Sequence, residues 1–350
     1  MSVAAGVSVL LASGGDLAAW QDFVDAMPGA NCMHHAGWHE VLRLAYRVRP
    51  LFLMACEPGG IVVGILPAYF SRSFLTGPHL STLEGGALAR SEAALQALFA
   101  EAMAVRDRLG ARYLQVRGGP VPAAAETTVR YIHTAIDTAR AREEIWRGIK
   151  RKTRWGIRQA EKQGIDVAHD PSLDGLADFY AAYAAHMRDL GTPVIGFATF
   201  TALRDAFGRD RLRLYLLRLD GHVIGGMLCI LNRSRWTDYF AVARHAEEAE
   251  FANYLLYWHV IRDAAAAGVA EFDLGRSTPD SNVHLFKRKW GGHDTDVPYY
   301  FYLAPGRTSS EFGLERLKQQ KGPLQRAWTH LPLVVANRLG PVLRRQLPFI

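Results

Sequence analysis

Cysteines are few in this sequence, and long apolar runs are absent. The 350 residues contain three cysteines, Cys32, Cys56 and Cys229, which lie far apart and show neither metal-ligand spacing nor a disulfide framework. This usage fits a reducing cytoplasm. No segment approaches the roughly 18 consecutive apolar residues that a membrane-spanning helix needs. We therefore expect a cytoplasmic protein that is not integral to a membrane.

Several catalytic and cofactor motifs are missing too. The sequence has no C-x-x-C pair, no G-x-S-x-G nucleophile turn, no phosphate-binding P-loop and no dinucleotide-binding glycine pattern. These absences argue against a zinc-ribbon site, a serine hydrolase of the common type and a nucleotide-binding α/β domain. We expect neither a metal ion nor a bound cofactor.

The chain is long enough for two domains, because 350 residues is about twice the usual domain length of 100–200 residues. Apolar residues make up 49% and charged residues 21%, as in a folded protein with a large core. Each half alternates strand and helix patterns around a central hairpin, turned by E-P-G-G at residues 57–60 and by Asp220-Gly221. The sequence predicts an α+β fold of two related domains with mixed, mainly antiparallel central sheets flanked by helices. The predicted ranges are 1–142 and 143–304, followed by a tail at 305–350.

A strongly basic segment opens the second predicted domain. Apolar spacing predicts a pair of helices here, with inward positions at Ile145, Ile149, Ile157 and Ala160. Residues 147–162 oppose a single acid, Glu161, with seven cations: Arg147, Lys150, Arg151, Lys152, Arg154, Arg158 and Lys162.

One face of this segment collects like charges. Lys150, Arg154 and Arg158 are spaced at i, i+4 and i+8, and their repulsion costs roughly a few tenths of a kcal/mol per pair. Such a face is either simply solvated or binds a polyanion, such as a phosphate-bearing substrate or a nucleic acid. Arginine suits phosphate because its guanidinium donates two parallel hydrogen bonds.

The tail is basic and apolar at once. Residues 305–350 contain eight basic and two acidic side chains, so +6 of the total charge of +7 lies there and +1 on the first 304 residues. No acid occurs from Leu324 onward, and prolines divide this stretch into short pieces. Short basic amphipathic segments lie in the headgroup region of anionic membranes. Residues 324–350 are therefore either a membrane-surface contact or an arm packed across the first domain with solvated arginines.

Several motifs in a fixed order resemble the FemAB family. Residues 146–167 read as a tryptophan, then K-x-K-x-R, then I-R-x-A-E-K-x-G-I-x-V; G-I-L-P at 64–67, D-L-G at 273–275 and F-K-x-x-W-G-G at 286–292 also follow the family pattern. FemAB proteins are aminoacyl and acyl transferases built from doubled GNAT-like domains. The resemblance, which covers about residues 5–304, thus implies two tandem GNAT-like domains. More narrowly, the chain is similar to the FemAB-type proteins that accompany exosortase and PEP-CTERM polysaccharide systems.

The resemblance also marks candidate site residues, all in the second domain. It implies direct transfer to an amine, with the donor held between splayed central strands. Lys287 is a candidate for phosphate binding or oxyanion stabilisation, Asp273 for orienting or deprotonating the amine, and Arg276 faces the same crevice. The alternatives are a turn cap for Asp273 and an exposed loop lysine for Lys287. The candidate substrate-binding residues are Lys150, Lys152, Arg154, Arg158, Asp238, Tyr239, Asn253 and Trp290.

The donor is expected to be an aminoacyl group rather than acetyl-CoA. GNAT proteins that use acetyl-CoA hold its pyrophosphate in a Q/R-x-x-G-x-G/A turn at a helix N-terminus. Residues 242–254, which should correspond, contain no glycine, and their three glutamates would repel a pyrophosphate. Relatives that take an amino acid from aminoacyl-tRNA share this departure. The basic segment is therefore expected to meet tRNA phosphates or a nucleotide-sugar carrier.

Three functions follow, in order of preference. The first is N-acyl or aminoacyl transfer to a cell-envelope or exopolysaccharide-related amine, with a phosphate-bearing glycan or a peptidoglycan-like molecule as acceptor. The second is a non-catalytic assembly factor that binds a glycan intermediate or the inner face of the cytoplasmic membrane. The third is a nucleic-acid reader, which is disfavoured because no recognised module is present and the first 304 residues carry only +1.

Overall fold

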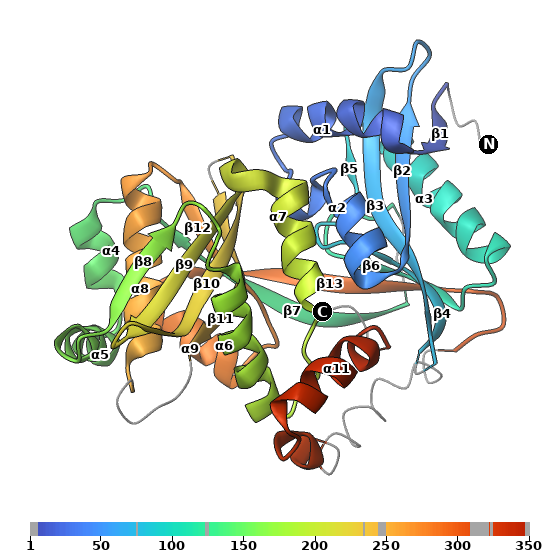
Figure 1. The fold of residues 1–350 in the computed structure, drawn as a ribbon. Coiled ribbons are helices and arrows are strands. Elements are labelled where there is room, and N and C mark those ends of the chain that lie inside the picture. Colours follow the sequence, from blue (N-terminus) through green and yellow to red (C-terminus); the bar gives the residue numbers. More distant parts are fainter. Residues whose placement is uncertain are drawn as a thin grey trace. The chain divides into compact units, whose positions relative to one another are not determined.

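The computed structural model divides the chain into two compact units. It describes residues 6–74, 76–122, 126–233, 235–243, 250–308, 322 and 325–346. Unit 1 comprises Met1–Arg130, Val297–Gly322 and Val342–Ile350, and unit 2 comprises Tyr131–Asp296 and Pro323–Pro341. Figure 1 labels the helices and strands of both units.

Unit 1 is built on a sheet with the strand order β1-β2-β3-β4-β6-β13, to which β5 adds by pairing with β3. β4 and β6 are parallel, and the other neighbours are antiparallel. The strands are β1 (Ser8–Leu11), β2 (Arg49–Cys56), β3 (Val62–Ser73), β4 (Gly77–Thr82), β5 (Leu88–Ala89), β6 (Tyr113–Arg117) and β13 (His293–Leu303), which joins unit 1 from Val297.

The helices of unit 1 precede or connect these strands. They are η1 (Gly14–Asp16), α1 (Leu17–Ala26), η2 (Cys32–His34), α2 (Trp38–Val41), η3 (Leu42–Tyr46) and α3 (Glu92–Arg108). α3 begins after Ser91, whose hydroxyl accepts the N–H of Ala94, and its Leu95, Leu98 and Phe99 enter the core of the unit. The parallel strands β4 and β6 are thus connected through α3.

Unit 2 repeats this organisation. Its strand order is β7-β12-β11-β10-β9-β8, in which only β11 and β12 are parallel. The strands are β7 (Glu126–Asp137), which joins unit 2 from Tyr131, β8 (Asp166–Asp170), β9 (Leu212–Leu219), β10 (His222–Asn232), β11 (Arg235–Ala243) and β12 (Glu271–Ser277). The helices are α4 (Arg142–Gly148), α5 (Arg151–Lys162), α6 (Leu176–Asp189), α7 (Phe197–Arg211), α8 (Ala252–Ala266), α9 (Asn282–Lys287), η5 (Arg288–Trp290) and the start of α11 (Leu333–Arg344).

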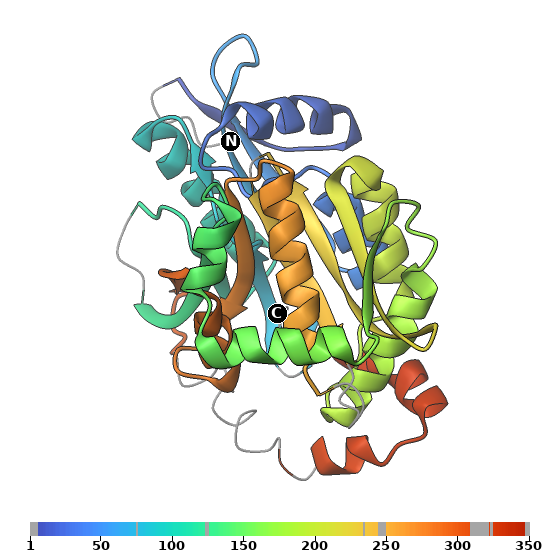
Figure 2. The same ribbon diagram turned by 90° about the vertical axis from the view of Figure 1, so that its left-hand side faces the viewer.

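The predicted fold class is confirmed, since each unit has a mixed sheet, mainly antiparallel, with one parallel pair connected through a helix. Helices cover both faces of the unit 2 sheet. On β10, Gly226 faces Phe179 of α6, whereas its neighbour Met227 belongs to the core beneath α8. Because successive strand residues point to opposite faces, α6 and α8 cover different faces. Figure 2 shows α8, in orange, along one face, with α5, in green, crossing one of its ends.

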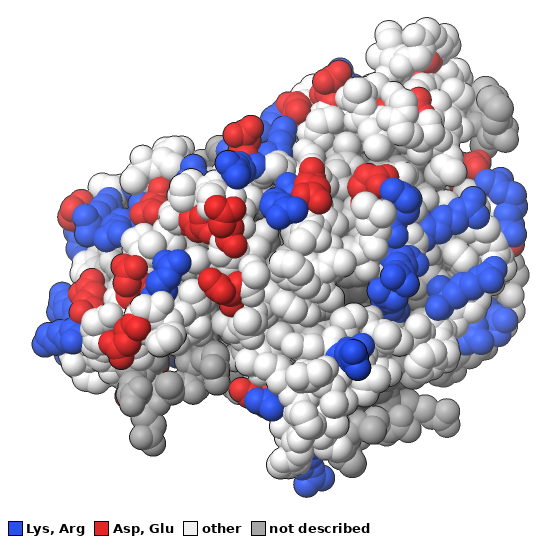
Figure 3. Space-filling model, viewed as in Figure 1, with Lys and Arg blue, Asp and Glu red and all other residues white. Residues whose placement is uncertain are grey.

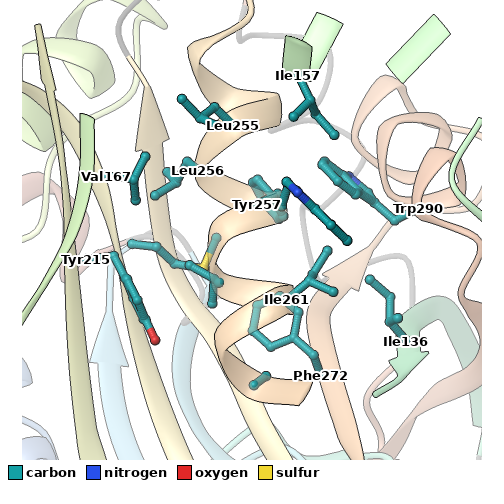
Figure 4. Close-up of a cluster of buried hydrophobic side chains, with 14 of the residues drawn as sticks. Ile136, Ile157, Val167, Tyr215, Leu255, Leu256, Tyr257, Ile261, Phe272 and Trp290 are labelled. Carbon is teal, nitrogen blue, oxygen red and sulfur yellow. The ribbon is translucent and has the colours of Figure 1, made fainter. Parts of the chain in front are cut away.

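The core beneath α8 is rich in aromatic side chains (Figure 4). Trp290 stacks on Tyr257 of α8 with ring centroids 5.5 Å apart. Helix α5 approaches α8 closely at Gly156, where a Cβ atom would lie 2.6 Å from the Tyr254 ring. A side chain at position 156 would therefore push the basic helix away from α8.

The compact units differ from the contiguous ranges expected from the sequence. β7 pairs with β12, which brings residues 131–137 into unit 2, and β13 pairs with β6, which returns residues 297–303 to unit 1. The unit to which a strand segment belongs is therefore set by the strands it pairs with and not by its position in the chain. Parts of two segments discussed above lie outside the described residues. They are 244–249, within the range that lacks the glycines of a pyrophosphate turn, and 309–321, 323–324 and 347–350 of the tail. Within the described chain, no helix combines the length and apolar character needed to cross a membrane.

Candidate active site

The parallel strands β11 and β12 stop pairing before they end. Their register finishes with Thr237 opposite Asp273, although β11 continues to Ala243 and β12 to Ser277. In open α/β sheets, ligands bind at the carboxyl ends of the strands. An opening between two parallel strands also offers backbone donors and acceptors to an extended ligand.

Both strands carry a β-bulge beside this opening. The register between β10 and β11 skips Tyr239, and on β12 Leu274 and Gly275 together stand opposite Thr134 of β7. Gly275 has a φ of +73°, a region that residues with a Cβ atom avoid. Bulges bend a strand and redirect its side chains. The two bulges therefore explain why the regular pairing of the two strands stops here.

Asp238, Tyr257 and Lys287 form a cluster on the α8 side of the opening. The Tyr257 hydroxyl donates to Asp238 Oδ2 at 2.6 Å. Desolvation raises the pKa of Asp238 to about 6, even though the Tyr257 hydrogen bond and the charge of Lys287 act to lower it. Burial also raises the pKa of Tyr257 well above its ordinary value. A carboxyl group poised near neutrality is typical of functional sites.

Lys287 is buried, with a relative exposure of 5%, so the alternative of an exposed loop lysine is wrong. Its Nζ donates to the carbonyl oxygens of Gly275 at 2.8 Å and Arg276 at 3.0 Å. A Cβ atom on Gly275 would lie 3.8 Å from this Nζ and 3.2 Å from the Asp238 carbonyl oxygen. The ammonium group therefore holds the bulged end of β12 beside β11.

Asp273 and His133 form a pair on the opposite face of the sheet. His133 Nδ1 lies 3.1 and 3.0 Å from the two carboxylate oxygens of Asp273. The Gly275 N–H also donates to Asp273 Oδ1 at 2.7 Å, so the expected turn contact is present as well. Phe272 and Leu274, on either side of Asp273, belong to the core under α8. The alternation of the strand therefore directs Asp273 away from α8.

Arg276 joins this second face. The register of β12 with β7 places Arg276 directly opposite His133, and directly opposed residues share a face. The Arg276 guanidinium lies 4.5 Å from the centre of the Tyr131 ring. Stacking on the ring holds the guanidinium in place on this face.

A second histidine–aspartate pair fastens α9 to the neighbouring strands. His284 Nε2 donates to Asp294 Oδ2 at 2.9 Å, and the Thr134 hydroxyl donates to Asp294 Oδ1 at 2.8 Å. The Asp280 N–H donates to His284 Nδ1 at 3.0 Å, which assigns the proton to Nε2. Because Lys287 ends α9, this network also positions Lys287.

The basic helix α5 directs its cations to solvent. Lys150, at its N-terminus, Lys152 and Arg158 are exposed, and Arg154 is half-buried. The Arg158 guanidinium lies 5.7 Å from the centre of the Trp146 ring. Blue side chains are visible at the left-hand edge of Figure 3, over α5. The structure thus places Asp238 and Lys287 on one face of the strand ends and Asp273 and Arg276 on the other, whereas the α5 cations are directed to solvent.

The remaining candidates have different surroundings. Trp290 is 1% exposed and supports Tyr257 from within the core. Tyr239 is half-buried and packs edge-on against Phe240, with ring centroids 4.5 Å apart. Asn253 is half-buried in the first turn of α8. Trp290 thus has a packing role here, and all three stay predictions as substrate contacts.

Sequence reasoning did not single out His133 or Tyr257. Tyr257 lies on an apolar helix face whose spacing indicates core, and His133 has no motif spacing to Asp273. The only sequence feature that could have pointed to His133 is the presence of a histidine within a predicted strand. Among the residues that the structure describes, no group of three or more His, Cys, Asp or Glu side chains is arranged to hold a metal ion.

The part of the chain that contains this candidate site also matches a known protein family. Residues 147–288 match the family described as an acetyltransferase (GNAT) domain. The matched range contains the separated strands β11 and β12, the connecting helix α8 and the whole of α9. Residues 147–288 are thus similar to a GNAT acetyltransferase domain.

Three solved structures share the fold over most of the chain. FemX matches with a TM-score of 0.66 and 14% identity over 89% of this chain and 100% of its own. A tandem GNAT protein from the clavulanic acid biosynthesis pathway matches with a TM-score of 0.55 and 15% identity over 86% of this chain and 100% of its own. L-PGS from Bacillus licheniformis matches with a TM-score of 0.55 and 13% identity over 88% of this chain and 97% of its own. At these identities the likeness is one of fold, and none of the curated proteins is similar enough in sequence to be a relative.

Proposed function

We propose that this protein is an acyltransferase that moves an acyl or aminoacyl group directly onto an amine at the opening between β11 and β12. The main support is the end of the parallel pairing at Thr237 and Asp273, inside the range that matches the GNAT family. Titratable side chains line both sides of the opening, with Asp238 and Lys287 toward α8 and Asp273 on the other face. Such an arrangement suits a donor held between the strands and an amine presented beside it.

The proposed roles follow from the contacts. Lys287 fixes the end of β12 and contributes positive charge where a carbonyl oxygen of the donor becomes negative during attack. Arg276, stacked on Tyr131, binds a phosphate or carboxylate of the acceptor. Asp238 and Tyr257 supply a proton-exchanging pair toward the donor.

For the donor we favour an aminoacyl group carried on tRNA over acetyl-CoA. The exposed cations Lys150, Lys152 and Arg158 on α5 can neutralise phosphates. At Gly156, α5 packs against Phe251 and Tyr254, which belong to residues 242–254, the range that should correspond to a pyrophosphate turn. Those residues have three glutamates and no glycine, which disfavours a pyrophosphate. For the acceptor we favour an amine on a phosphate-bearing glycan or a peptidoglycan-like molecule. The narrower link to exosortase and PEP-CTERM systems stays a prediction.

The alternative is a non-catalytic assembly factor at the inner face of the cytoplasmic membrane, and α11 is the observation that favours surface contact. This helix turns small residues, Ala336 and Gly340, inward and exposes Val334 (71%), Leu339 (48%) and Val342 (57%). The surface over α11 is largely uncharged with isolated basic side chains (Figure 3). Membrane contact is compatible with either function, because a transferase acting on lipid-linked glycans would work at the same surface.

The test measures donor binding first and transfer second. The full-length protein is titrated with acetyl-CoA by calorimetry and with charged and uncharged bulk tRNA by filter binding. Transfer of radiolabelled amino acid to glucosamine 1-phosphate, a phosphate-bearing amine, is then followed. We expect no heat from acetyl-CoA, tighter binding of charged tRNA, and transfer that Lys287→Met abolishes and Arg288→Met preserves. Saturable acetyl-CoA binding would identify a small-acyl transferase, and absence of transfer from either donor would favour the assembly factor.

A further inference from the structure

We propose that helix α5 binds a single-stranded stretch of RNA, with an unpaired base stacked on Trp155 and the adjoining phosphates on the cations beside it. This inference rests on the proposed aminoacyl-tRNA donor and specifies the part of that RNA that the protein contacts. The aminoacyl group of a charged tRNA is carried at an unpaired 3′ end, and proteins recognise such ends through their unstacked bases.

Trp155 is an exposed aromatic side chain in the middle of α5. Its relative exposure is 50%, whereas Thr153, Gly156 and Ile157 close to it in the helix are buried. Helix α5 crosses one end of α8 (Figure 2), and the Trp155 side chain is left largely outside the core that the two helices share. A single exposed apolar residue is common on protein surfaces, so the neighbours of Trp155 decide what it indicates.

Cations flank Trp155 on both sides along the helix. Residues three and four positions apart are neighbours on a helix surface, so Arg151 and Lys152 lie one turn before Trp155 and Arg158 lies one turn after it. All three cations are exposed, and the first turn of α5 contains no acid. The Arg158 guanidinium lies 5.7 Å from the centre of the Trp146 ring, which restrains it. The Trp155 surface, defined as these three cations and Trp155, thus combines one aromatic ring with three positive charges.

Phe251, at the start of α8, supports the Trp155 ring. The two ring centroids are 5.2 Å apart and the ring planes are inclined at 77°. In an edge-to-face pair one ring presents its edge and the other its face, so this contact covers at most one face of the indole. The ring is therefore held in place by a neighbour and still offers a face on which a base can stack.

A row of stacked rings leads from Phe251 toward the candidate active site, all within unit 2. Phe251 stacks on Tyr254 with centroids 6.1 Å apart, and Tyr254 stacks on Phe286 at 5.9 Å. Phe286 directly precedes the buried Lys287 at the end of α9. An RNA end that stacks on Trp155 is therefore bound at the outer end of a row of rings that finishes beside Lys287.

The composition of this surface favours RNA over a lipid bilayer. Proteins bind single strands by neutralising phosphates with cations and by stacking bases on aromatic side chains, a mode that tolerates any base sequence. A helix that lies in a membrane surface needs an extended apolar face instead. Helix α5 buries Ile157 and Ala160 and exposes one large apolar side chain among cations, whereas α11 exposes several, including Val334 and Leu339. The two helices thus suit different partners.

The test measures binding of the full-length protein to a short, fluorescently labelled single-stranded RNA of mixed sequence and to a blunt-ended RNA duplex. We expect Trp155→Leu to weaken binding of the single strand about tenfold, and Trp155→Phe, which keeps a ring, to weaken it less than about threefold. Duplex binding should change by less than about twofold, because the phosphates provide its affinity. The control Phe74→Leu removes a ring that is 74% exposed in unit 1 and should change neither affinity.

Salt dependence separates stacking from charge. Trp155→Leu should keep the wild-type slope of log K against log salt, because loss of a stacked base releases no counterions. Replacement of Lys152 and Arg158 with glutamine should make the slope shallower. A shallower slope in Trp155→Leu would show that this residue acts on the phosphate contacts, and it would overturn the stacking role.

Other results would also overturn the inference. These are a loss of single-strand affinity below about twofold in Trp155→Leu, or an equal loss for the duplex. Weaker co-sedimentation of Trp155→Leu with phosphatidylglycerol vesicles would assign the surface to a membrane, and displacement of the RNA by equimolar uridine diphosphate would assign it to a nucleotide-sugar carrier. If the wild type binds the single strand through Trp155 but transfers no amino acid, the proposed function fails and this surface stands. If transfer occurs and Trp155→Leu binds like wild type, only this inference fails.

Discussion

His133 Nδ1 lies 3.0 Å from Asp273 Oδ2, although 140 positions separate the two residues in the chain. The contact exists because β7, which precedes the basic helices, pairs with β12, which follows α8. Unit 2 therefore takes one half of this pair from a strand that begins in the sequence of unit 1. The geometry of this strand pairing leads to several measurable expectations.

Removing the buried ammonium of Lys287 should be costly. Lys287→Met leaves the carbonyl groups of Gly275 and Arg276 without their donor and removes a charge that lowers the pKa of Asp238. We expect the free energy of unfolding to fall by about 2–4 kcal/mol. Urea denaturation measures this loss. The neighbouring control Arg288→Met removes a cation that is 56% exposed and should change stability by less than about 0.5 kcal/mol. Equal effects of both variants would contradict the buried role.

Asp238 should make stability depend on pH. Its pKa is raised from 3.8 to about 6, so the folded state holds the proton over a pH range in which the unfolded state has lost it. The contribution of Asp238 is thus fully present below about pH 4, declines as the pH rises to about 6, and is constant above that. The total decline is about 3 kcal/mol.

Asp238→Asn removes this titration. Chemical denaturation of both proteins between pH 4.5 and 8 should show that the variant gains stability relative to wild type as the pH rises toward 6.5, with no further gain above it. A difference that is the same at every pH would show that Asp238 does not titrate in this range.

Replacing Gly275 should destabilise the protein more than its positive φ alone implies, because its neighbours lie close to the position of a Cβ atom. Gly275→Ala and Gly268→Ala both put a Cβ atom on a residue with positive φ, but only position 275 has neighbours within 4 Å. We expect Gly268→Ala to lower the unfolding free energy by about 1–2 kcal/mol and Gly275→Ala to lose about 1–3 kcal/mol more. Transfer should fall in Gly275→Ala alone. Thermal unfolding measures the stability of the two variants, and a transfer assay measures their activity. Identical losses of stability in both variants would show that the close contact at position 275 has no effect.

The α5 surface should contribute electrostatically to tRNA binding. Replacing Lys152 and Arg158 with glutamine removes two exposed cations and leaves the buried face of α5 intact. The slope of log K against log salt should become shallower by roughly 0.7–0.9 for each phosphate contact that is lost. Filter binding of bulk tRNA at several salt concentrations measures this slope. Arg204→Gln on α7, a cation that is 47% exposed, is the control and should leave the slope unchanged.

The exposed side chains of α11 should anchor the protein to anionic bilayers. Leu339→Asp places a charge among exposed apolar residues, and we expect co-sedimentation with phosphatidylglycerol vesicles to drop at least about tenfold, because a charged group is costly to bury. Ile61→Asp alters a residue that is 60% exposed on the β2–β3 turn of unit 1, and it should have no effect. Binding of wild type to neutral phosphatidylcholine vesicles that equals binding to anionic ones would argue against this role.

The local features of unit 2 were predictable from the sequence. The inward positions Ile145, Ile149, Ile157 and Ala160 are all at most 2% exposed, as the helical spacing predicted. These outcomes depend on periodicity within one helix, where the sequence neighbours of a residue are also its spatial neighbours.

The sequence by itself determined the α+β class and the basic helix pair, and its resemblance to the FemAB family singled out Asp273, Arg276 and Lys287 as candidates. Only the tertiary structure decided that Lys287 is buried beneath the β12 bulge, that Asp238 faces Tyr257, and that Asp273 faces His133. Helix patterns can be read locally because their hydrogen bonds close within four residues. Strand pairing joins segments at any separation, so the partners of β12 were fixed by the sheet as a whole.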